Sequence, residues 1–158
     1  MRRILELISL AALAALAWVT YGALAGPHPL KGRIPIHFDL AGRPNGWGSP
    51  HSLLILPVIA DALYLLLVWV SRHPATFNYP VQVTAENRPR LEALAIHLIA
   101  WLKAEILCLL VWIQVTAIAA AHQGHARLSP SMAPVSIGII LGTVIAHIIA
   151  MRRLAPSA

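Results

Sequence analysis

The stretch IPIHFDLAGRPNGWGSP, residues 34–50, gathers prolines, glycines and charged residues between two long apolar runs. One run precedes it, at about residues 4–25, and one follows it, at about residues 50–70. Its prolines exclude a continuous helix, because proline lacks an amide hydrogen and clashes with the preceding turn. The sequence therefore predicts two helices joined by a structured loop, residues 26–49. Within this loop Ile34–Phe38 predicts a short extended segment, and Pro44-Asn45-Gly46 predicts a turn.

The composition of the chain is typical of an integral membrane protein. Hydrophobic residues make up 58% of its 158 residues and charged residues 11%, against ~45–50% and ~25% in soluble proteins. So little charge cannot cover a water-soluble surface. Two further apolar runs, at about residues 91–121 and 135–151, complete the pattern. The sequence predicts an all-α fold with four transmembrane helices in one membrane domain, residues 1–158.

The first apolar run has a second interpretation. Arg2-Arg3, the apolar stretch and Ala23-Leu24-Ala25 also fit a secretory signal with a small-residue cleavage site. The run of about 22 residues exceeds the ~7–15 apolar residues of such a signal, which favours a retained helix.

The basic residues predict the orientation of the helices, since cytoplasmic connections carry an excess of Lys and Arg. If the helices alternate in direction, one side holds seven basic residues and the other holds four: Arg2, Arg3, Arg72, Arg88, Arg90, Arg152 and Arg153 against Lys31, Arg33, Arg43 and Arg127. Both termini are therefore predicted in the cytoplasm, and the 26–49 loop outside. Because these residues form short clusters at the ends of apolar runs, the net charge of +6 does not indicate nucleic-acid binding.

Several ionisable residues lie inside the apolar runs, where a charge costs about 2.5–3.5 kcal/mol by insertion scales and needs a partner or a role. Asp61 and Lys103 fall at similar distances from the same end of their helices, so they can lie level and pair. Glu105 is about 200° around the helix from Lys103. Lys103 and Gln114 thus form one polar stripe, and Glu105 forms another with His97.

These stripes allow two interpretations. The first is a structural Asp61–Lys103 pair, with Glu105 hydrogen-bonded to a neighbour or facing an oligomer partner. The second is a polar seam for an ion, a proton or a buried ligand. His147, with Ser136 and Thr143 on the same face, predicts an interhelical hydrogen-bond stripe.

Histidines gather on the predicted outer side, and imidazoles are common ligands of zinc and copper. The metal-site candidates are His28, His37, His51, His122 and His125, with Asp39 beside them. No ligand spacing joins the histidines of the first loop to those near residue 122. The pattern favours polar groups at a wet interface, and no cofactor is predicted.

Gly138 and Gly142 form a small-xxx-small motif, which lets another helix approach closely. A partner helix within the same chain and a partner in a homo- or hetero-oligomer are equally compatible with this motif.

The loop carries a resemblance to a known family. Ile34-Pro35-Ile36-His37-Phe38, followed by Gly42, Pro44 and Gly46-Trp47-Gly48-Ser49, resembles the signature of a bacterial membrane domain of unknown function. In that family I-P-x-H-[FW] leads to G-x-P-[DN]-G-[WY]-G between the first two membrane helices, often in SdpI-like immunity proteins. The resemblance implies a small multi-pass protein of the bacterial inner membrane with a role in toxin immunity or signalling.

The leading hypothesis for function is a non-enzymatic recognition cap. Short loops rarely need so much turn chemistry merely to connect helices. We expect His37, Asp39, Arg43 and Trp47 to contact a peptide, a partner protein or a lipid-embedded molecule. One alternative is an accessory subunit of a larger membrane complex. A second is metal or proton handling through the outer histidines and Asp61.

Overall fold

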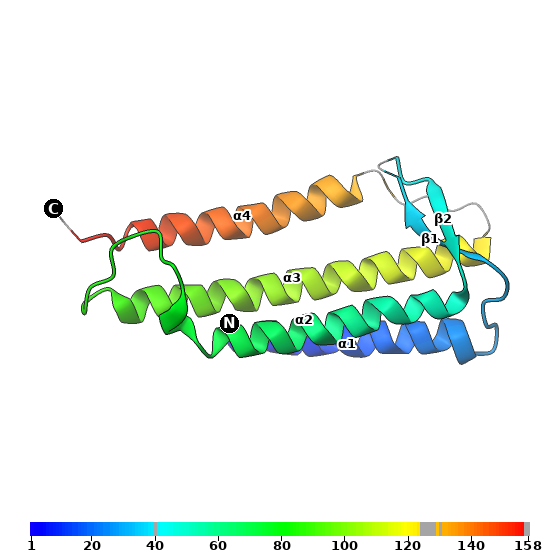
Figure 1. The fold of residues 1–158 in the computed structure, drawn as a ribbon, viewed down its shortest axis with the longest axis horizontal. Coiled ribbons are helices and arrows are strands. Elements are labelled where there is room, and N and C mark those ends of the chain that lie inside the picture. The colour runs from blue at the N-terminus through cyan, green and yellow to red at the C-terminus, as the bar shows by residue number, and fades with distance from the viewer. Residues whose placement is uncertain (40, 124–128, 130, 157–158) are drawn as a thin grey trace.

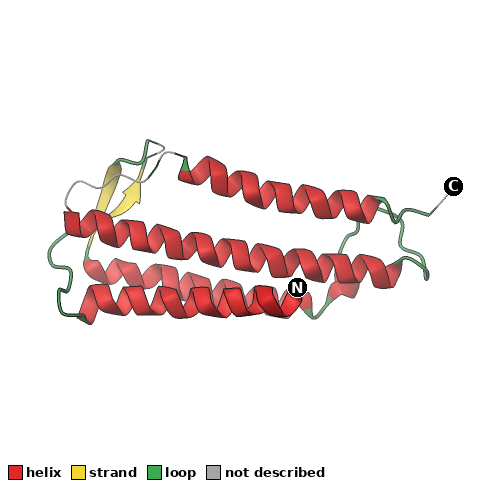
Figure 2. Cartoon of the chain, turned by 180° about the vertical axis from the view of Figure 1, so that it is seen from behind, coloured by secondary structure: helices red, strands yellow, loops and turns green. Residues whose placement is uncertain are grey.

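The computed structural model describes residues 1–39, 41–123, 129 and 131–156, which form four long helices and one β-hairpin (Figures 1 and 2). The helices are α1 (Arg2–Ala25), α2 (Ile55–Ser71), α3 (Arg88–Gln123) and α4 (Met132–Arg152). The hairpin pairs β1 (Ile34–Phe38) with β2 (Pro44–Gly48) in antiparallel register. Two 3₁₀ turns, η1 (Pro50–Leu54) and η2 (Pro74–Thr76), precede and follow α2.

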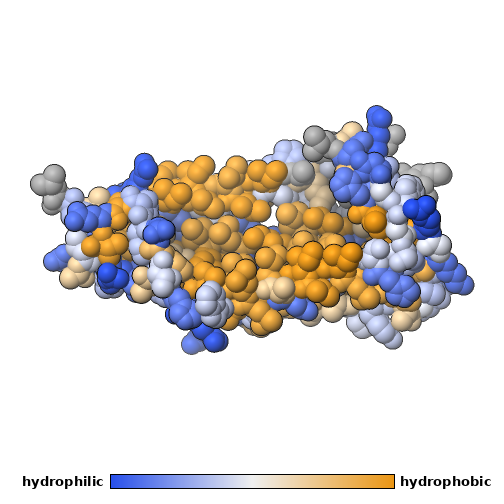
Figure 3. All heavy atoms as spheres, viewed as in Figure 1, coloured by the Kyte–Doolittle hydropathy of each residue, from blue (hydrophilic) through white to orange (hydrophobic). Residues whose placement is uncertain are grey.

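All four predicted helical segments are long and apolar enough to cross a membrane. Figure 3 shows a broad apolar surface along the middle of the helices, with polar groups at both ends. The start of α1 and the end of α4 lie at one end of the bundle, which we call the terminal end, and the hairpin lies at the other, the hairpin end (Figure 1). The predicted all-α membrane fold is confirmed, with a hairpin added between the first two spanning helices.

α1 and α3 pack closely along the centre of the bundle. The buried residues of α1 recur every three or four positions and so line a single stripe: Leu5, Ser9, Ala12, Leu16, Thr20 and Ala23. Four of the six are small, which lets the two helix backbones approach each other. Leu16 packs with Leu107 of α3 and Ala60 of α2, so three helices share this layer.

α3 has 36 residues and is about 54 Å long at ~1.5 Å per residue, well beyond a ~30 Å hydrocarbon core. Its extra length packs against the connector that follows α2 and against the end of α4. Leu91 is fully buried there with Ala95 and Met151. The buried Asn87 side chain donates to the Leu154 carbonyl at 3.0 Å, which ties the start of α3 to the chain after α4.

The described turn residues of the hairpin are Asp39, Ala41, Gly42 and Arg43, whereas Pro44-Asn45-Gly46 belongs to a strand, so the prediction of a turn there is wrong. Gly42 supplies a φ of 72°, and its amide donates to the Asp39 carbonyl at 2.9 Å. Asp39 Oδ1 accepts the amides of Ala41 and Arg43 at 2.9 and 2.8 Å. These hydrogen bonds complete the turn before Pro44, the first residue of β2.

Gly46 lies in β2 opposite His37. A Cβ at this position would come within 2.9 Å of the His37 Cβ, so glycine serves the close approach of the two strands.

Candidate functional site

The hairpin is anchored on the helix bundle through Ile34. This side chain is 2% exposed and packs with Ala23 of α1 and Leu53 of η1. The Arg33 guanidinium donates to the Trp47 carbonyl at 2.9 Å and so joins the approach to β1 with β2. The hairpin is therefore held in a fixed position over the ends of the helices.

The structure places the four predicted recognition residues on the hairpin with different local roles. His37 Nδ1 hydrogen-bonds with Asn45 Oδ1, which orients its exposed ring. The Asp39 carboxylate is engaged by the two turn amides, so it fixes the loop. The Trp47 side chain is 47% exposed. The Arg43 side chain is exposed and makes no hydrogen bond or ion pair within the described part of the chain.

Lys103 pairs with Glu6 of α1, and the predicted Asp61–Lys103 pair is wrong. Lys103 Nζ lies 2.6 Å from Glu6 Oε2, and the lysine side chain is 6% exposed. Tyr64 of α2 donates to Glu6 Oε1 at 2.6 Å, and its ring centroid lies 4.7 Å from Lys103 Nζ. Asp61 is exposed on the surface of α2. Counting residues along two helices estimates relative depth but not rotation about the axis, and rotation excludes this pair.

Gln114 lies on the same stripe of α3 as Lys103 and is 1% exposed. Its Nε2 donates to Thr20 Oγ1 of α1 at 2.8 Å and to the Leu53 carbonyl at 2.9 Å. The predicted common stripe of Lys103 and Gln114 is therefore confirmed, and both residues bind partners on α1.

Glu105 and His97 interact with α4 instead. Thr143 Oγ1 donates to Glu105 Oε1 at 2.6 Å, whereas Glu105 Oε2 is buried without a hydrogen-bond partner among the described residues. His147 Nε2 lies 3.4 Å from His97 Nδ1, and His147 Nδ1 lies 2.8 Å from the Thr143 carbonyl. Thr143 and His147 thus belong to an interhelical hydrogen-bond stripe, as predicted.

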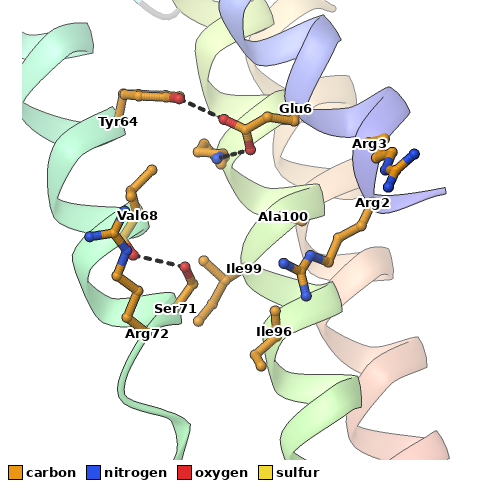
Figure 4. Close-up of a pocket in the computed structure, with 11 residues that line it drawn as sticks. Arg2, Arg3, Glu6, Tyr64, Val68, Ser71, Arg72, Ile96, Ile99 and Ala100 are labelled. Carbon is orange, nitrogen blue, oxygen red and sulfur yellow. Dashed lines mark hydrogen bonds and ion pairs between the residues drawn. The ribbon is translucent and has the colours of Figure 1, made fainter.

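A cavity of about 670 Å³ opens between α1, α2 and α3 at the terminal end (Figure 4). Glu6, Tyr64 and Lys103 line it on the side nearer the middle of the bundle, and Val68 and Ile99 contribute to an apolar wall. Arginines from two helices stand at the terminal end of the same cavity: Arg2, Arg3 and Arg72. Figure 4 shows Arg2 and Arg72 on opposite sides of the space between α1 and α2. The sequence predicts only a role in membrane orientation for these arginines.

The predicted outer histidines do not form a cluster in the part of the chain that the structure describes. His28, His51 and His122 are exposed, and His125 lies outside the described residues. Among the described residues, no three His, Cys, Asp or Glu side chains are grouped to hold a metal ion. On the hairpin, the His37 ring is hydrogen-bonded to the side-chain amide oxygen of Asn45.

Gly138 and Gly142 do not mediate packing within the described part of the chain. Both are exposed on α4, and a Cβ at either position would meet no atom within 4 Å. A partner helix within the same chain is therefore not observed for this motif among the described residues.

Comparison with protein families gives a match over residues 7–60 to DUF1648, a domain of unknown function. The match covers most of α1, the whole hairpin and the start of α2. No curated protein and no solved structure matches the chain. The match and the resemblance of the loop both indicate a membrane domain of unknown function.

Proposed function

We propose that this small multi-pass membrane protein is a non-enzymatic receptor whose hairpin recognises a partner outside the cytoplasm. The observation that carries the proposal is the rigid anchoring of a partly apolar hairpin at a polar end of the bundle. Ile34 and Arg33 fix the hairpin, while Trp47 and Ile36 stay 47% and 49% exposed. Exposed apolar side chains on a rigid support are typical of binding surfaces.

The exposed side chains define the chemistry of the partner. Trp47 and Ile36 offer apolar contacts, Arg43 offers a guanidinium, and Asn45 holds the ring of His37 in one orientation. This combination fits a peptide or protein segment that presents an apolar residue beside an acidic group. Under the predicted orientation, a secreted toxin or an extracytoplasmic signalling partner approaches from this side. The resemblance to SdpI-like proteins supports a role in toxin immunity or signalling in a bacterial inner membrane.

Complementation of a deletion strain tests this proposal. The variant H37A/W47A removes the oriented ring and the indole, and it leaves the buried anchor Ile34 in place. We expect it to reach wild-type abundance in the membrane and to lose complementation. K31A, exposed at the same end but outside the hairpin, is the control and should complement fully. If H37A/W47A restores every phenotype at wild-type abundance, the recognition cap is refuted.

A second candidate function is that of an accessory subunit in a larger membrane complex. It is favoured by the exposed stripe of Gly138, Gly142 and Ala146 on α4, which the described part of the chain does not cover. Such a stripe permits close contact with another membrane helix. The oligomeric size of natively expressed protein in mild detergent should fall in G138L/G142L and stay unchanged in G22L, which alters an exposed glycine on α1. A wild-type protein that is monomeric under these conditions refutes the subunit role.

A further inference from the structure

We infer that the cavity at the terminal end binds the phosphate group of an anionic ligand, with Arg2 and Arg72 as its main contacts. This inference concerns the end of the molecule opposite to the hairpin and does not depend on the proposed recognition function. It rests on the charge, the pairing and the shape of the cavity.

The charges around the cavity are unbalanced. Four cationic side chains and one carboxylate line it, which leaves a net charge of +3: Arg2, Arg3, Arg72 and Lys103 against Glu6. The carboxylate is already matched, since Lys103 binds one of its oxygens and Tyr64 the other. None of the three arginines has an acidic partner within 4.0 Å in the described ranges. Their guanidinium groups therefore remain available for an anion from outside the chain.

Arginine suits a phosphate better than lysine does, because lysine offers only a point charge. The planar guanidinium of arginine presents paired N–H donors that match two phosphate oxygens. Arg2 comes from the first turn of α1 and Arg72 from the end of α2, so an anion between them would be held from two helices (Figure 4).

The size and lining of the cavity fit a phosphate that carries an organic group. A volume of about 670 Å³ equals the liquid volume of roughly twenty water molecules at ~30 Å³ each, enough for a lipid headgroup. Val68, Ile96 and Ile99 supply apolar surface along the same cavity. Basic pockets between transmembrane helices on the cytoplasmic side are typical sites for anionic headgroups, and the predicted orientation places this cavity there.

The Glu6–Lys103–Tyr64 cluster sets how deep the anion can enter. Lys103 is neutralised by Glu6, and the carboxylate repels a second anion. The phosphate is therefore confined to the terminal end beside Arg2 and Arg72. Glu6 is a positioning residue here, not a direct ligand.

The competing explanation is that these arginines only orient the helices, and a matched pair of variants separates the two. R2Q/R72Q removes two charges from the cavity. R152Q/R153Q removes two charges from the same end of the molecule, at positions that do not line the cavity. Each leaves five basic residues on the terminal side against four on the other, so the orientation signal is equally reduced.

Native mass spectrometry of the full chain, released from vesicles of phosphatidylglycerol and phosphatidylethanolamine, measures retained lipid. Wild-type protein should retain phosphatidylglycerol in preference to phosphatidylethanolamine. R2Q/R72Q should retain about tenfold less, since charge-assisted contacts are lost, and R152Q/R153Q should stay within about twofold of wild type. If R2Q/R72Q and R152Q/R153Q lost equal amounts of retained phosphatidylglycerol, the inference would be overturned. If R2Q/R72Q fails to accumulate, R72Q alone should lower retention about threefold relative to R152Q.

A second arm distinguishes a lipid headgroup from a soluble phosphate compound. Lipid-depleted wild-type protein is heated in inorganic phosphate and, as a control, in chloride at equal ionic strength. Protection by phosphate that R2Q/R72Q loses, without retention of phosphatidylglycerol, would support the phosphate site and assign it to a soluble ligand. Absence of both phosphate protection and lipid preference in the wild-type protein would overturn it.

Discussion

The two polar stripes of α3 differ in how many of their polar atoms have a hydrogen-bond or ion-pair partner. Toward α1, Lys103 is paired with Glu6, and Gln114 donates to Thr20 and the Leu53 carbonyl. Toward α4, Glu105 keeps one buried oxygen without a partner in the described part of the chain. We infer that the first stripe stabilises the packing of α1, α2 and α3. The second stripe contributes less to stability, so substitutions in it should be tolerated better.

Glu6→Leu should produce the largest loss of stability. It leaves the Lys103 ammonium, 6% exposed, without its counter-ion, and it also removes the acceptor of the Tyr64 hydroxyl. Breaking a fully buried pair costs ~3–5 kcal/mol, and because Glu6 is partly exposed we expect about 2–3 kcal/mol. Denaturant unfolding in detergent micelles measures this free energy. A loss of less than about 1 kcal/mol in the free energy of unfolding would contradict the stabilising role of this stripe.

The double variant E6L/K103M should recover most of that stability. Apolar replacement of both partners removes the uncompensated charge, and such replacements of buried pairs are often neutral. The same unfolding assay on both single variants and the double variant gives the coupling energy. Purely additive losses would show that the two side chains do not interact.

Gln114→Leu should cost about 1 kcal/mol. It removes the donors to Thr20 and to the buried Leu53 carbonyl, and interhelical hydrogen bonds in membranes average ~0.6 kcal/mol with values up to ~1.7. Thr116→Val serves as the control, because the Thr116 hydroxyl donates only within its own helix. Equal losses for the two variants would mean that Gln114 does not join the helices.

Glu105→Gln should have the smallest effect, within about 0.5 kcal/mol of wild type, as for a substitution that breaks no paired network. The amide keeps the acceptor oxygen for Thr143 and removes a carboxylate oxygen that has no partner. Glu6→Gln is the matched change on the other stripe and should destabilise the protein, since Lys103 loses its counter-charge. A larger loss for E105Q than for E6Q would reverse the comparison of the two stripes.

Much of the fold follows from local sequence patterns. Apolar runs of sufficient length define the four spanning helices, and the β-branched segment Ile34–Phe38 defines β1. The common stripe of Lys103 and Gln114 follows from their spacing of eleven residues along one helix. The hairpin turn was missed, although Asp39 followed by Gly42 three residues later is a turn signature that could have located it.

The remaining features depend on how the helices are rotated and where they end. Glu6 lies near the start of its run, so nothing local identified it as the partner of Lys103. The cavity at the terminal end exists because α1 begins and α2 ends beside the longer α3, and the arginines at those two ends surround the space. The sequence predicts that Arg2 and Arg72 lie on the same side of the membrane, but it carries no sign that they line one cavity.

Photo-crosslinking from the hairpin in intact cells tests the proposed recognition function most directly. A photoreactive aromatic residue at position 47 keeps the character of Trp47, and the same residue at position 31 is the control outside the strands. We predict a discrete adduct from position 47, lost when His37→Ala is added, and no such adduct from position 31. Identical adducts from both positions, or no adduct from position 47 in cells that the protein complements, would contradict the recognition cap.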